Sequence, residues 1–464
     1  MMLHPYNLPG NIIFNNPGAP TVLIHADHKR RDAASALLIG YYLSDLGYNT
    51  VIGSRLTSRM LYYYFRPEVV LTTHPDAIFQ PGRLEVEAKH CKFVHMHPES
   101  SAMVRKSMIP HMRGGPEEIG NAYTKHISKV FTWGPLLKDW VVEEKFYSEE
   151  QVNVVGCVRY DFYRGCKRVE RWQQTLGGMP SFSGISTYDK SNRFSNINDA
   201  RNSPGIHYGI KGGFEDYLWA AAAYIRLFLE FLDVWCLELK RPIAFRPYTL
   251  ENIRDYDFFR KRYGGQFSID VNTPFPKWLL QRYASIFCYS SSIIESVISG
   301  VPYITFQEIL GERLEYHQPR SEMPDVRGDI YKYTYQPESM DELVHLATQA
   351  REGRLPLRTS LEQSSSLRKM LWDYYGWPQE KPSAQIVAEE IHKIMQENGK
   401  NNIIPRIRFL REIASYCKQV GLTTRFGLWK TFNDYHFMPW HMQEKKYAYK
   451  EYQRLKEEEK INGL

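Results

Sequence analysis

The stretch from Tyr283 to Gln307, YASIFCYSSSIIESVISGVPYITFQ, constrains the fold of this chain more than any other. An apolar run from Ala284 to Tyr289 predicts a buried strand, and Ile293 to Ser299 predicts a helix. Val301 to Phe306 predicts a second strand. A strand, a helix and a strand in this order form one unit of a parallel sheet, so we expect an α/β fold.

The predicted helix begins beside three hydroxyl side chains, Ser290, Ser291 and Ser292. Ser292 stands three residues before Glu295, a spacing that allows a capping box while other backbone N–H groups remain available. Such a helix start attracts anions, because unpaired N–H groups and the positive end of the helix dipole lie together. The pattern therefore fits both a well-capped helix in a parallel sheet and a cradle for a diphosphate.

The chain is long enough for two domains, since its 464 residues can build two cores of ordinary size. Hydrophobic residues make up 43% and charged residues 24%, which is typical of a globular protein and excludes a disordered one. The net charge of +7 favours phosphorylated ligands or an anionic membrane surface as partners. The basic residues are dispersed, which argues against nucleic-acid binding.

The six cysteines show no C-x-x-C spacing, which predicts a reduced, cytoplasmic protein without a zinc site. The N-terminus lacks a charged region followed by a long apolar core, and no run of eighteen apolar residues occurs. We therefore expect no signal peptide and no membrane span.

The N-terminal part begins with a second strand, helix and strand, at Thr21–His25, Ala33–Leu46 and Tyr48–Gly53. Ligands of parallel sheets lie beyond the carboxyl ends of the strands. The residues that follow the first strand are therefore candidates for an acceptor or cleft site: Asp27, Lys29, Arg30 and Arg31. The alternative is that Asp32 caps the helix and that the basic residues form a solvated turn.

Further strands are predicted at Val69–Thr72, Lys92–Met96 and Lys129–Thr132. The second of these runs into His97 and Glu99, side chains that can transfer protons near neutral pH when their surroundings shift them. A satisfied core histidine and a helix-capping glutamate are the alternative. His95 and His97 stand two residues apart, on one face of the predicted strand, but no third ligand stands at metal-binding spacing, so we expect no metal site.

The domain boundaries follow from changes in composition. We expect an N-terminal Rossmann-like domain over 1–165, a crossover over 166–213 rich in Gly, Ser and Asn, a C-terminal Rossmann-like domain over 214–400, and a helical extension over 401–464. The crossover has one plausible strand, at 185–187. Elements expected in the second domain before the opening stretch are helices at 215–240, 251–263 and 276–283 and strands at 242–246 and 266–269.

Six segments in order, VLIHADHKRRD, FVHMHPES, FTWGPLLKDWV, VVGCVRYD, FRPYTLEN and SSSIIESVISGVPYITF, resemble the bacterial surface carbohydrate biosynthesis proteins. This family is similar to capsule-type Kdo transferases, CDP-glycerol glycerophosphotransferases and, more distantly, UDP-GlcNAc 2-epimerases. The resemblance covers Thr21 to Gln307. It implies a GT-B-like fold, in which two Rossmann-like domains face a cleft, together with a nucleotide-sugar donor and a lipopolysaccharide or capsule-type product.

The resemblance also implies roles for individual residues. FRPYTLEN matches a phosphate or ribose loop, with Arg246 where the family usually has His, so a phosphate contact is kept and proton transfer is lost. HPES matches a segment that holds an acidic residue before Gly, here Glu99 before Ser100. VVGCVRYD matches a segment at the domain junction and retains Arg159 and Asp161.

We therefore predict a glycosyltransferase that moves a sugar from a nucleotide-activated donor to a surface-glycan acceptor. The three serines, Arg246 and Glu295 would bind the donor. Glu99, Asp161 or His97 would deprotonate the acceptor, or one carboxylate would act as nucleophile. No metal cofactor is expected, and Asp255 and Asp257, a D-x-D pair, are interpreted as helix surface.

Two other functions remain open on the sequence alone: a nucleotide-sugar epimerase of the same fold, and a non-catalytic assembly protein of a glycan-export complex. The C-terminal extension also has two interpretations. Its basic and aromatic residues, over 405–419 and 426–442, fit docking on an anionic membrane at the inner face, where glycolipid acceptors reside. They equally fit helices that cross back and pack on the first domain.

Overall fold

The computed structural model contains two compact units, each built on its own sheet. The first unit comprises Met1–Arg164 with Arg368–Leu464, and the second comprises Gly165–Leu367. The residues that the structure describes are 11–13, 18–26, 29–54, 57–76, 78–96, 105–114, 117–166, 169–170, 174–179, 226–247, 256–287, 292–305, 308–309, 330, 332–358, 364–397 and 442–462. Among these residues no helix combines the length and the apolar character that a membrane span needs.

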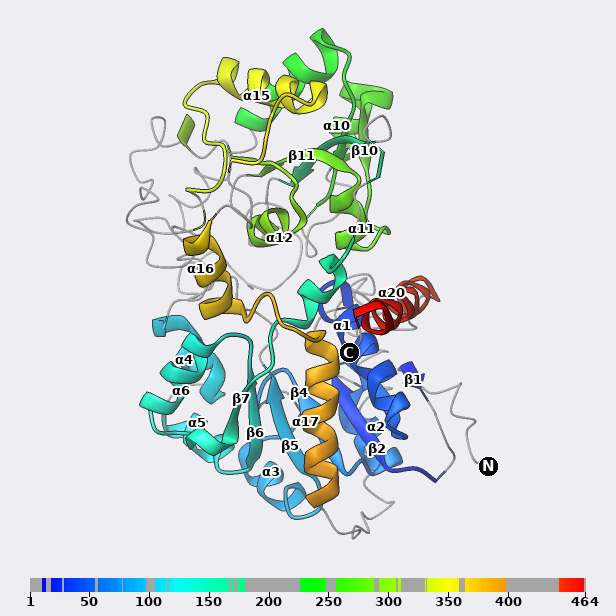
Figure 1. Cartoon of the computed structure of the whole chain (residues 1–464), viewed down its shortest axis with the longest axis vertical. Coiled ribbons are helices and arrows are strands. Elements are labelled where there is room, and N and C mark those ends of the chain that lie inside the picture. The colour runs from blue at the N-terminus through cyan, green and yellow to red at the C-terminus, as the bar shows by residue number, and fades with distance from the viewer. Residues whose placement is uncertain are drawn as a thin grey trace. The chain divides into compact units, whose positions relative to one another are not determined.

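The first unit contains a seven-stranded sheet in the order β1-β3-β2-β4-β5-β6-β7 (Figure 1). All neighbouring strands pair in parallel except β1, which pairs antiparallel with β3 at the edge. The strands are β1 (Asn11–Ile13), β2 (Thr21–His25), β3 (Asn49–Gly53), β4 (Val69–Thr72), β5 (Lys92–Met96), β6 (Ile127–Thr132) and β7 (Val152–Val154). Every strand predicted for the N-terminal part is present within two residues.

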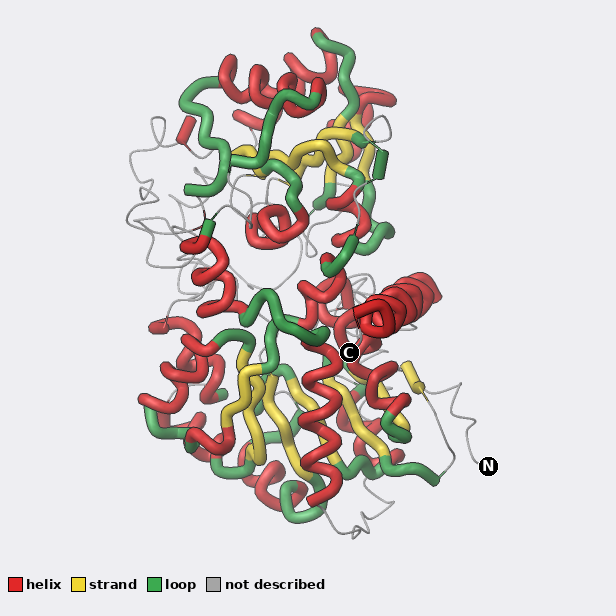
Figure 2. Tube along the Cα trace, viewed as in Figure 1, coloured by secondary structure: helices red, strands yellow, loops and turns green. Residues whose placement is uncertain are grey.

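Helices cover both faces of this sheet, as a parallel sheet requires. They are α1 (Lys29–Asp45), α2 (Ser58–Phe65), α3 (Pro81–Glu87), α4 (Arg105–Arg113), α5 (Glu117–Thr124), α6 (Pro135–Glu143), α17 (Ser383–Glu397) and α20 (Met442–Asn462). Short 3₁₀ helices occur at η2 (Glu149–Gln151) and η3 (Val158–Tyr163), and α16 (Ser365–Tyr375) contains the boundary between the units. Figure 2 shows the strands of this sheet side by side among the helices.

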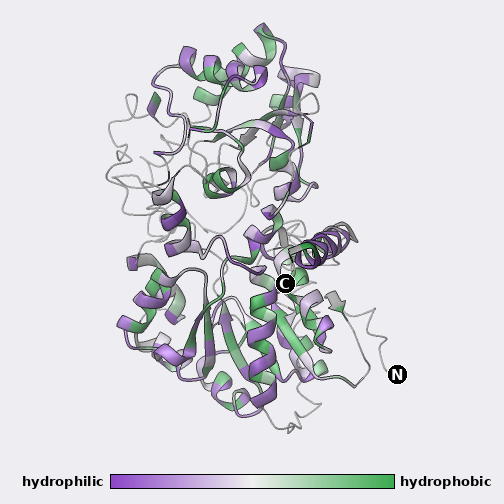
Figure 3. Cartoon of the chain, viewed as in Figure 1, coloured by the Kyte–Doolittle hydropathy of each residue, from purple (hydrophilic) through white to green (hydrophobic). Residues whose placement is uncertain are grey.

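Alternation along the strands divides the buried side chains between the two faces. Val22 and Ile24 of β2 pack in one core with α1 and α17. On α2, Tyr62 packs against Phe79 and Phe93, with ring centroids 5.0 and 6.1 Å apart. The middle residues of these strands are apolar, such as Val22, Leu23 and Ile24 of β2, which is why the strands could be predicted from the sequence. Figure 3 colours β2 as largely hydrophobic.

The C-terminal helices α17 and α20 both pack on α1 of the first unit. The apolar stripe of α17 includes Val387 and Ile391, which are fully buried. This corrects the predicted boundary, which placed 214–400 in the second domain. For 442–462 the structure favours packing on the first domain over membrane docking, whereas 401–441 lies outside the described residues.

Figure 3 colours α20 as largely hydrophilic. Aromatic and polar contacts along its length fix this helix on the first unit. Tyr447 stacks on Phe162 of η3 with ring centroids 5.3 Å apart. Tyr42 of α1 donates a hydrogen bond to Glu459 over 3.0 Å. Arg454 donates to the carbonyl of Arg164 at the end of the first chain segment of this unit.

Asp161 of η3 anchors the start of α17. Its two carboxylate oxygens accept the backbone N–H groups of Ser383 and Ala384 over 2.9 and 2.8 Å. These N–H groups belong to the first turn of the helix and have no partner within it. The Asp161 side chain is fully buried. We therefore replace the predicted catalytic role of Asp161 with a structural one, because a buried carboxylate that caps a helix does not reach a substrate.

The second unit contains a five-stranded, fully parallel sheet in the order β10-β9-β8-β11-β12. The strands are β8 (Thr175–Met179), β9 (Ile243–Phe245), β10 (Phe267–Ile269), β11 (Arg282–Phe287) and β12 (Tyr303–Thr305). The helices are 226–232 continued by the π-helix η6 (Asp233–Glu238), α10 (Asp257–Tyr263), η8 (Gly264–Gln266), α11 (Phe275–Leu280), α12 (Ser292–Ser299) and α15 (Met340–Glu352). Two Rossmann-like sheets, each with its own helices, confirm the expected α/β fold class with two domains of this kind. The cleft between the two domains stays a prediction.

The central strand of the second sheet, β8, lies in the segment that the sequence analysis treated as a crossover. Its sequence, TLGGM, has two glycines in the middle, which weakens the strand signal. A Cβ atom on Gly177 would lie 2.9 Å from Trp278 of α11, and one on Gly178 would lie 3.0 Å from Ile243. The glycines thus allow close packing on both faces. The strand predicted at 185–187 lies outside the described residues.

We predict that Gly177→Ala lowers the stability of the second unit by about 1–3 kcal/mol, because the added methyl group overpacks against Trp278, Arg282 and Ser285. Gly265→Ala is the matched control, since a Cβ atom there meets nothing within 4 Å. Denaturant melts of the two variants measure the difference. Equal midpoints for both would contradict the close packing described for β8.

The stability conferred by Asp161 should depend on pH. Burial raises the pKa of Asp161 to about 7, against the lowering effect of the Ala384 and Ser383 N–H groups and of Arg164. The folded chain therefore holds this proton more tightly than the unfolded chain, and the contribution is present at acidic pH and lost as the pH rises through about 7.

We expect the melting temperature of the wild type, relative to Asp161→Asn, to be highest near pH 5 and to decline toward pH 8, because the amide does not titrate. Asp139→Asn, at an exposed position on α6, should show a difference that is flat with pH. Thermal melts at both pH values test this. A gap between wild type and Asp161→Asn that widens with rising pH would contradict it.

Candidate functional site

The first sheet changes the direction of its strand order between β2 and β4. The chain goes from β2 to β3 on one side and then returns to β4 on the other. Helices before and after such a point lie on opposite faces, which leaves a crevice at the carboxyl ends of the two strands. This is the position at which open α/β sheets bind ligands.

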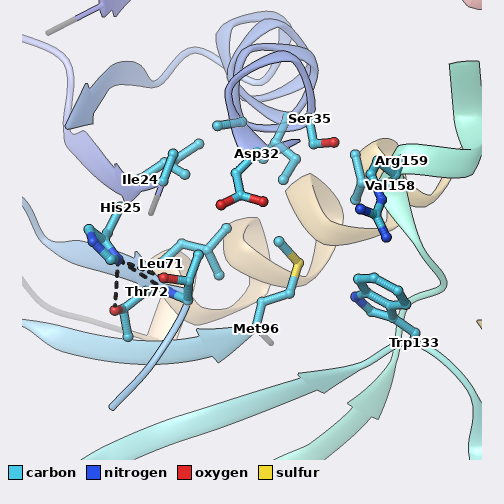
Figure 4. Close-up of a pocket in the computed structure, with 14 residues that line it drawn as sticks. Ile24, His25, Asp32, Ser35, Leu71, Thr72, Met96, Trp133, Val158 and Arg159 are labelled. Carbon is cyan, nitrogen blue, oxygen red and sulfur yellow. Dashed lines mark hydrogen bonds between the residues drawn. The ribbon is translucent and has the colours of Figure 1, made fainter. Parts of the chain in front are cut away.

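A cavity of about 40 Å³ lies at this point, and every residue on its wall belongs to the first unit (Figure 4). It has room for about three water-sized spheres. Its floor is apolar and includes Ile24 and Leu71. The polar residues on its wall are His25, Asp32, Ser35, Thr72, Thr73 and Arg159.

His25, the last residue of β2, is held in one orientation by the end of β4. Its Nδ1 lies 2.9 Å from the Thr73 hydroxyl and 3.5 Å from the Thr73 backbone nitrogen. A backbone N–H only donates, so Nδ1 accepts and the neutral ring carries its proton on Nε2. The imidazole is 1% exposed. It therefore forms part of a preorganised wall at the switch point of the sheet.

Asp32 provides the carboxylate of the cavity. It is the fourth residue of α1, and Figure 4 shows its side chain pointing from the helix toward Met96, between His25 and Arg159. Side chains in a helix tilt toward its N-terminus, where the dipole is positive and a negative charge is favourable. Asp32 is only 9% exposed. On the sequence alone Asp32 had two interpretations, a residue at the ligand-binding edge or a helix cap, and the structure places it on the wall of the cavity.

Arg159 of η3 and Trp133, which follows β6, form the far side of the cavity in Figure 4. The Arg159 guanidinium carbon lies 5.5 Å from the centroid of the Trp133 ring. This distance allows a cation–π interaction, which helps to fix the guanidinium. The cavity thus has a carboxylate on one wall and a guanidinium on the other.

The second sheet has its own switch point, between β8 and β11. When its strands are numbered in chain order from β8, they lie side by side in the order 3-2-1-4-5. This is the strand order of a mononucleotide-binding sheet. The helix α12 follows β11, so its start lies at the carboxyl edge beside β8. This helix belongs to the stretch from which the sequence analysis began. The anion-binding position predicted at the start of this helix therefore lies at the carboxyl edge of the sheet, where parallel sheets bind ligands.

Arg246 follows β9 directly and lies at the same carboxyl edge, with β8 between it and β11. Its Nη1 donates to the carbonyl of Thr273 over 2.6 Å. The rings of Phe275 and Trp278 lie 5.6 and 5.9 Å from its guanidinium carbon. Arg246 is 9% exposed, so the guanidinium is held firmly and part of its hydrogen-bonding capacity stabilises the loop before α11.

Of the other predicted donor-binding residues, Ser292 and Glu295 lie on α12 and are 7% and 5% exposed. Ser292 is the first residue of the helix, one residue earlier than predicted. Gly300 ends the helix with a φ of 69°, a left-handed conformation that glycine adopts at low cost. The predicted helix is therefore present, and the donor-binding role of its residues stays a prediction.

Several predicted site residues fall outside the described residues, and their roles stay predictions. They are Asp27, His97, Glu99, Ser290 and Ser291. Lys29, Arg30 and Arg31 form the first turn of α1, but their side chains are not described. In the sequence, all eight of these residues come within a few positions after the end of a predicted strand.

The cavity residues that sequence reasoning missed are short polar groups at strand ends: His25, Thr72 and Thr73. A strand that ends in His or in Thr-Thr carries no motif, so only the pairing of β2 with β4 reveals that these side chains meet. Trp133 also follows a strand directly. The rule that ligands lie at the carboxyl edge would have selected these positions without assigning them a role.

No family model and no curated protein sequence matches this chain. Similar solved structures include the wall teichoic acid polymerase TagF, with 11% identity, a TM-score of 0.49, and 82% of this chain and 90% of that one covered. The UDP-GlcNAc 2-epimerase of Methanocaldococcus jannaschii, in complex with UDP-GlcNAc and UDP, has 10% identity, a TM-score of 0.43, and 82% and 100% covered. The UDP-GlcNAc 2-epimerase of Neisseria meningitidis, bound to UDP-GlcNAc, has 8% identity and a TM-score of 0.44, with 82% of this chain and 100% of that one covered. These similarities give no residue of this chain a role, and the fold class rests on the two sheets themselves.

Proposed function

We propose that this protein is a glycosyltransferase that moves a sugar from a nucleotide-activated donor to a hydroxyl group of a surface-glycan acceptor. The second unit binds the phosphates of the donor, and the first unit receives the acceptor. The observation that carries the proposal is the position of α12, whose start lies at the switch point of a sheet with the strand order of a mononucleotide-binding domain.

Three features of the second unit support a phosphate ligand at this edge. The N-terminus of α12 presents backbone N–H groups and the positive end of the helix dipole. Arg246 brings a permanent positive charge to the same edge of the sheet. Its fixed guanidinium can offset the charge that develops on the leaving nucleotide without reorganisation. A fixed cation of this kind lowers the barrier more than a mobile one.

The small volume of the cavity in the first unit supports the proposal that this unit binds the acceptor and the second unit binds the donor. A space of about 40 Å³ fits a small polar group. Its walls carry both a hydrogen-bond acceptor, Asp32, and a donor, Arg159. An alcohol both donates and accepts hydrogen bonds, so the cavity fits the acceptor rather than the donor.

A nucleotide-sugar epimerase of the same fold is the second candidate, because it would use the same phosphate edge. It needs no acceptor, whereas a transferase without an acceptor only hydrolyses its donor slowly. Incubation with a nucleotide sugar alone, followed by chromatography of the products, distinguishes the two. Rapid conversion into an isomeric nucleotide sugar would replace the transferase by an epimerase.

Donor binding is tested by thermal shift with CMP-, CDP-, UDP- and GDP-sugars. At a hundredfold excess over Kd, ligand binding adds about 2.7 kcal/mol, which raises the melting temperature of a unit of this size by roughly 5 °C or more. We expect one nucleotide class to give such a shift. No shift with any of them would favour the third function, a non-catalytic assembly protein.

Arg246→Ala should weaken donor binding about 10- to 100-fold, which corresponds to the loss of charge-assisted hydrogen bonds. Arg246→Lys should recover only part of this affinity, because lysine lacks the planar fork. Lys277→Ala is the matched control, since Lys277 is an exposed cation on the neighbouring helix α11. Calorimetric titration with the best nucleotide measures all three. Wild-type affinity in Arg246→Ala would remove the phosphate assignment.

A further inference from the structure

The amino edge of the first sheet carries a groove of about 550 Å³, on the opposite edge from the cavity described above. Its walls come from the starts of neighbouring strands: Lys92 begins β5, Ile127 begins β6, and Gln151 comes directly before β7. The turns that follow α3 and α5 and the end of α17 complete the walls, and all of these elements belong to the first unit. Figure 1 shows α3 and the end of α17 together at the bottom of the view.

Four lysines line this groove: Lys89, Lys92, Lys125 and Lys129. In the part of the chain that the structure describes, the side chains of the first three make no ion pair and no hydrogen bond. Lys129 donates to the backbone carbonyl of Glu150 over 2.6 Å and has two further N–H donors. Ammonium groups around one hollow repel one another, so a bound anion lowers the electrostatic energy of the groove.

The other polar groups on the wall leave this excess of positive charge in place. Two carboxylates, Glu85 and Glu397, also line the groove, so four lysines against two carboxylates give a formal charge of +2. Lys92 and Lys129 lie on strands, so they do not serve as cations that stabilise the end of their own helix. The groove therefore favours an anionic ligand.

We propose that this groove binds a small soluble ligand that carries two or more phosphate groups. Lysine binds phosphate as a compact point charge, and the four lysines come from four different elements, so they can reach phosphate groups at separate positions. The volume lies in the range of pockets that bind small molecules and exceeds what a single anion needs. A flat membrane surface meets projecting side chains, whereas these lysines surround a hollow. This proposal does not depend on the transferase activity.

Calorimetric titration of the full-length chain tests the proposal, with inorganic pyrophosphate and fructose 1,6-bisphosphate as probes and inorganic phosphate as the control ligand. Because the proposed donor site also favours phosphates, both the wild type and Arg246→Ala are titrated. We expect at least one probe to bind both proteins, about 10-fold or more tighter than inorganic phosphate, because it makes charge-assisted contacts through two phosphate groups. Binding should weaken as sodium chloride is added, since salt screens exposed charges.

Variants of the lysines locate the bound probe. Lys92→Ala should weaken binding about 3- to 10-fold, the effect of one exposed charged contact. The triple variant, which combines Lys89→Ala, Lys92→Ala and Lys125→Ala, should not bind. Lys450→Ala, at an exposed position on α20 outside the groove, is the matched control and should bind as the wild type does. All four lysines are exposed, so these variants keep the fold, which thermal melts without ligand verify.

Several outcomes would overturn the proposal. A wild type that binds neither probe does so, and so does a triple variant that still binds, because the attraction is then adventitious. Binding that is lost in Arg246→Ala and kept in the triple variant places the phosphates on the second unit, which removes this site and supports the proposed donor site. Sedimentation with phosphatidylglycerol vesicles that the triple variant loses, without binding of soluble probes, assigns the groove to lipid headgroups instead.

Discussion

Each connection between two parallel strands must cross one face of the sheet. Neighbouring parallel strands therefore have their carboxyl ends at the same edge. In the first unit this brings the end of β2 next to the end of β4, so that His25 meets Thr73. In the second unit it places the start of α12 beside β8. The chemistry proposed for each unit depends on this constraint and not on any single motif.

The first unit is completed by the far end of the chain. Asp161 accepts hydrogen bonds from residues 222 and 223 positions later, and these bonds fix the start of α17. With α17 in place, α1 is covered by α17 and α20, and Asp32 is held at the first turn of a buried helix. The C-terminal helices therefore act on the site indirectly, because they fix the helix that carries its carboxylate.

The sequence predicted the elements well and their partners less well. Apolar runs such as Thr21–His25 and Lys92–Met96 became strands at the predicted positions, because buried parallel strands leave a strong local signal. The strand β8 was missed, since its two glycines serve packing that only the neighbouring α11 and β9 reveal. Asp161 was one of three candidates for the catalytic group. Its structural role could not be predicted, because its partner Ser383 is distant in the chain and no local pattern records such a contact.

We propose that a nucleotide binds by its phosphates at the carboxyl edge of the second sheet. A crystal structure of the full-length chain soaked with the nucleoside diphosphate of highest affinity tests it most directly. We expect phosphate density within hydrogen-bond distance of the first N–H groups of α12, on the side of Arg246. Phosphates bound at the amino edge of the sheet, or against the first unit, would contradict it.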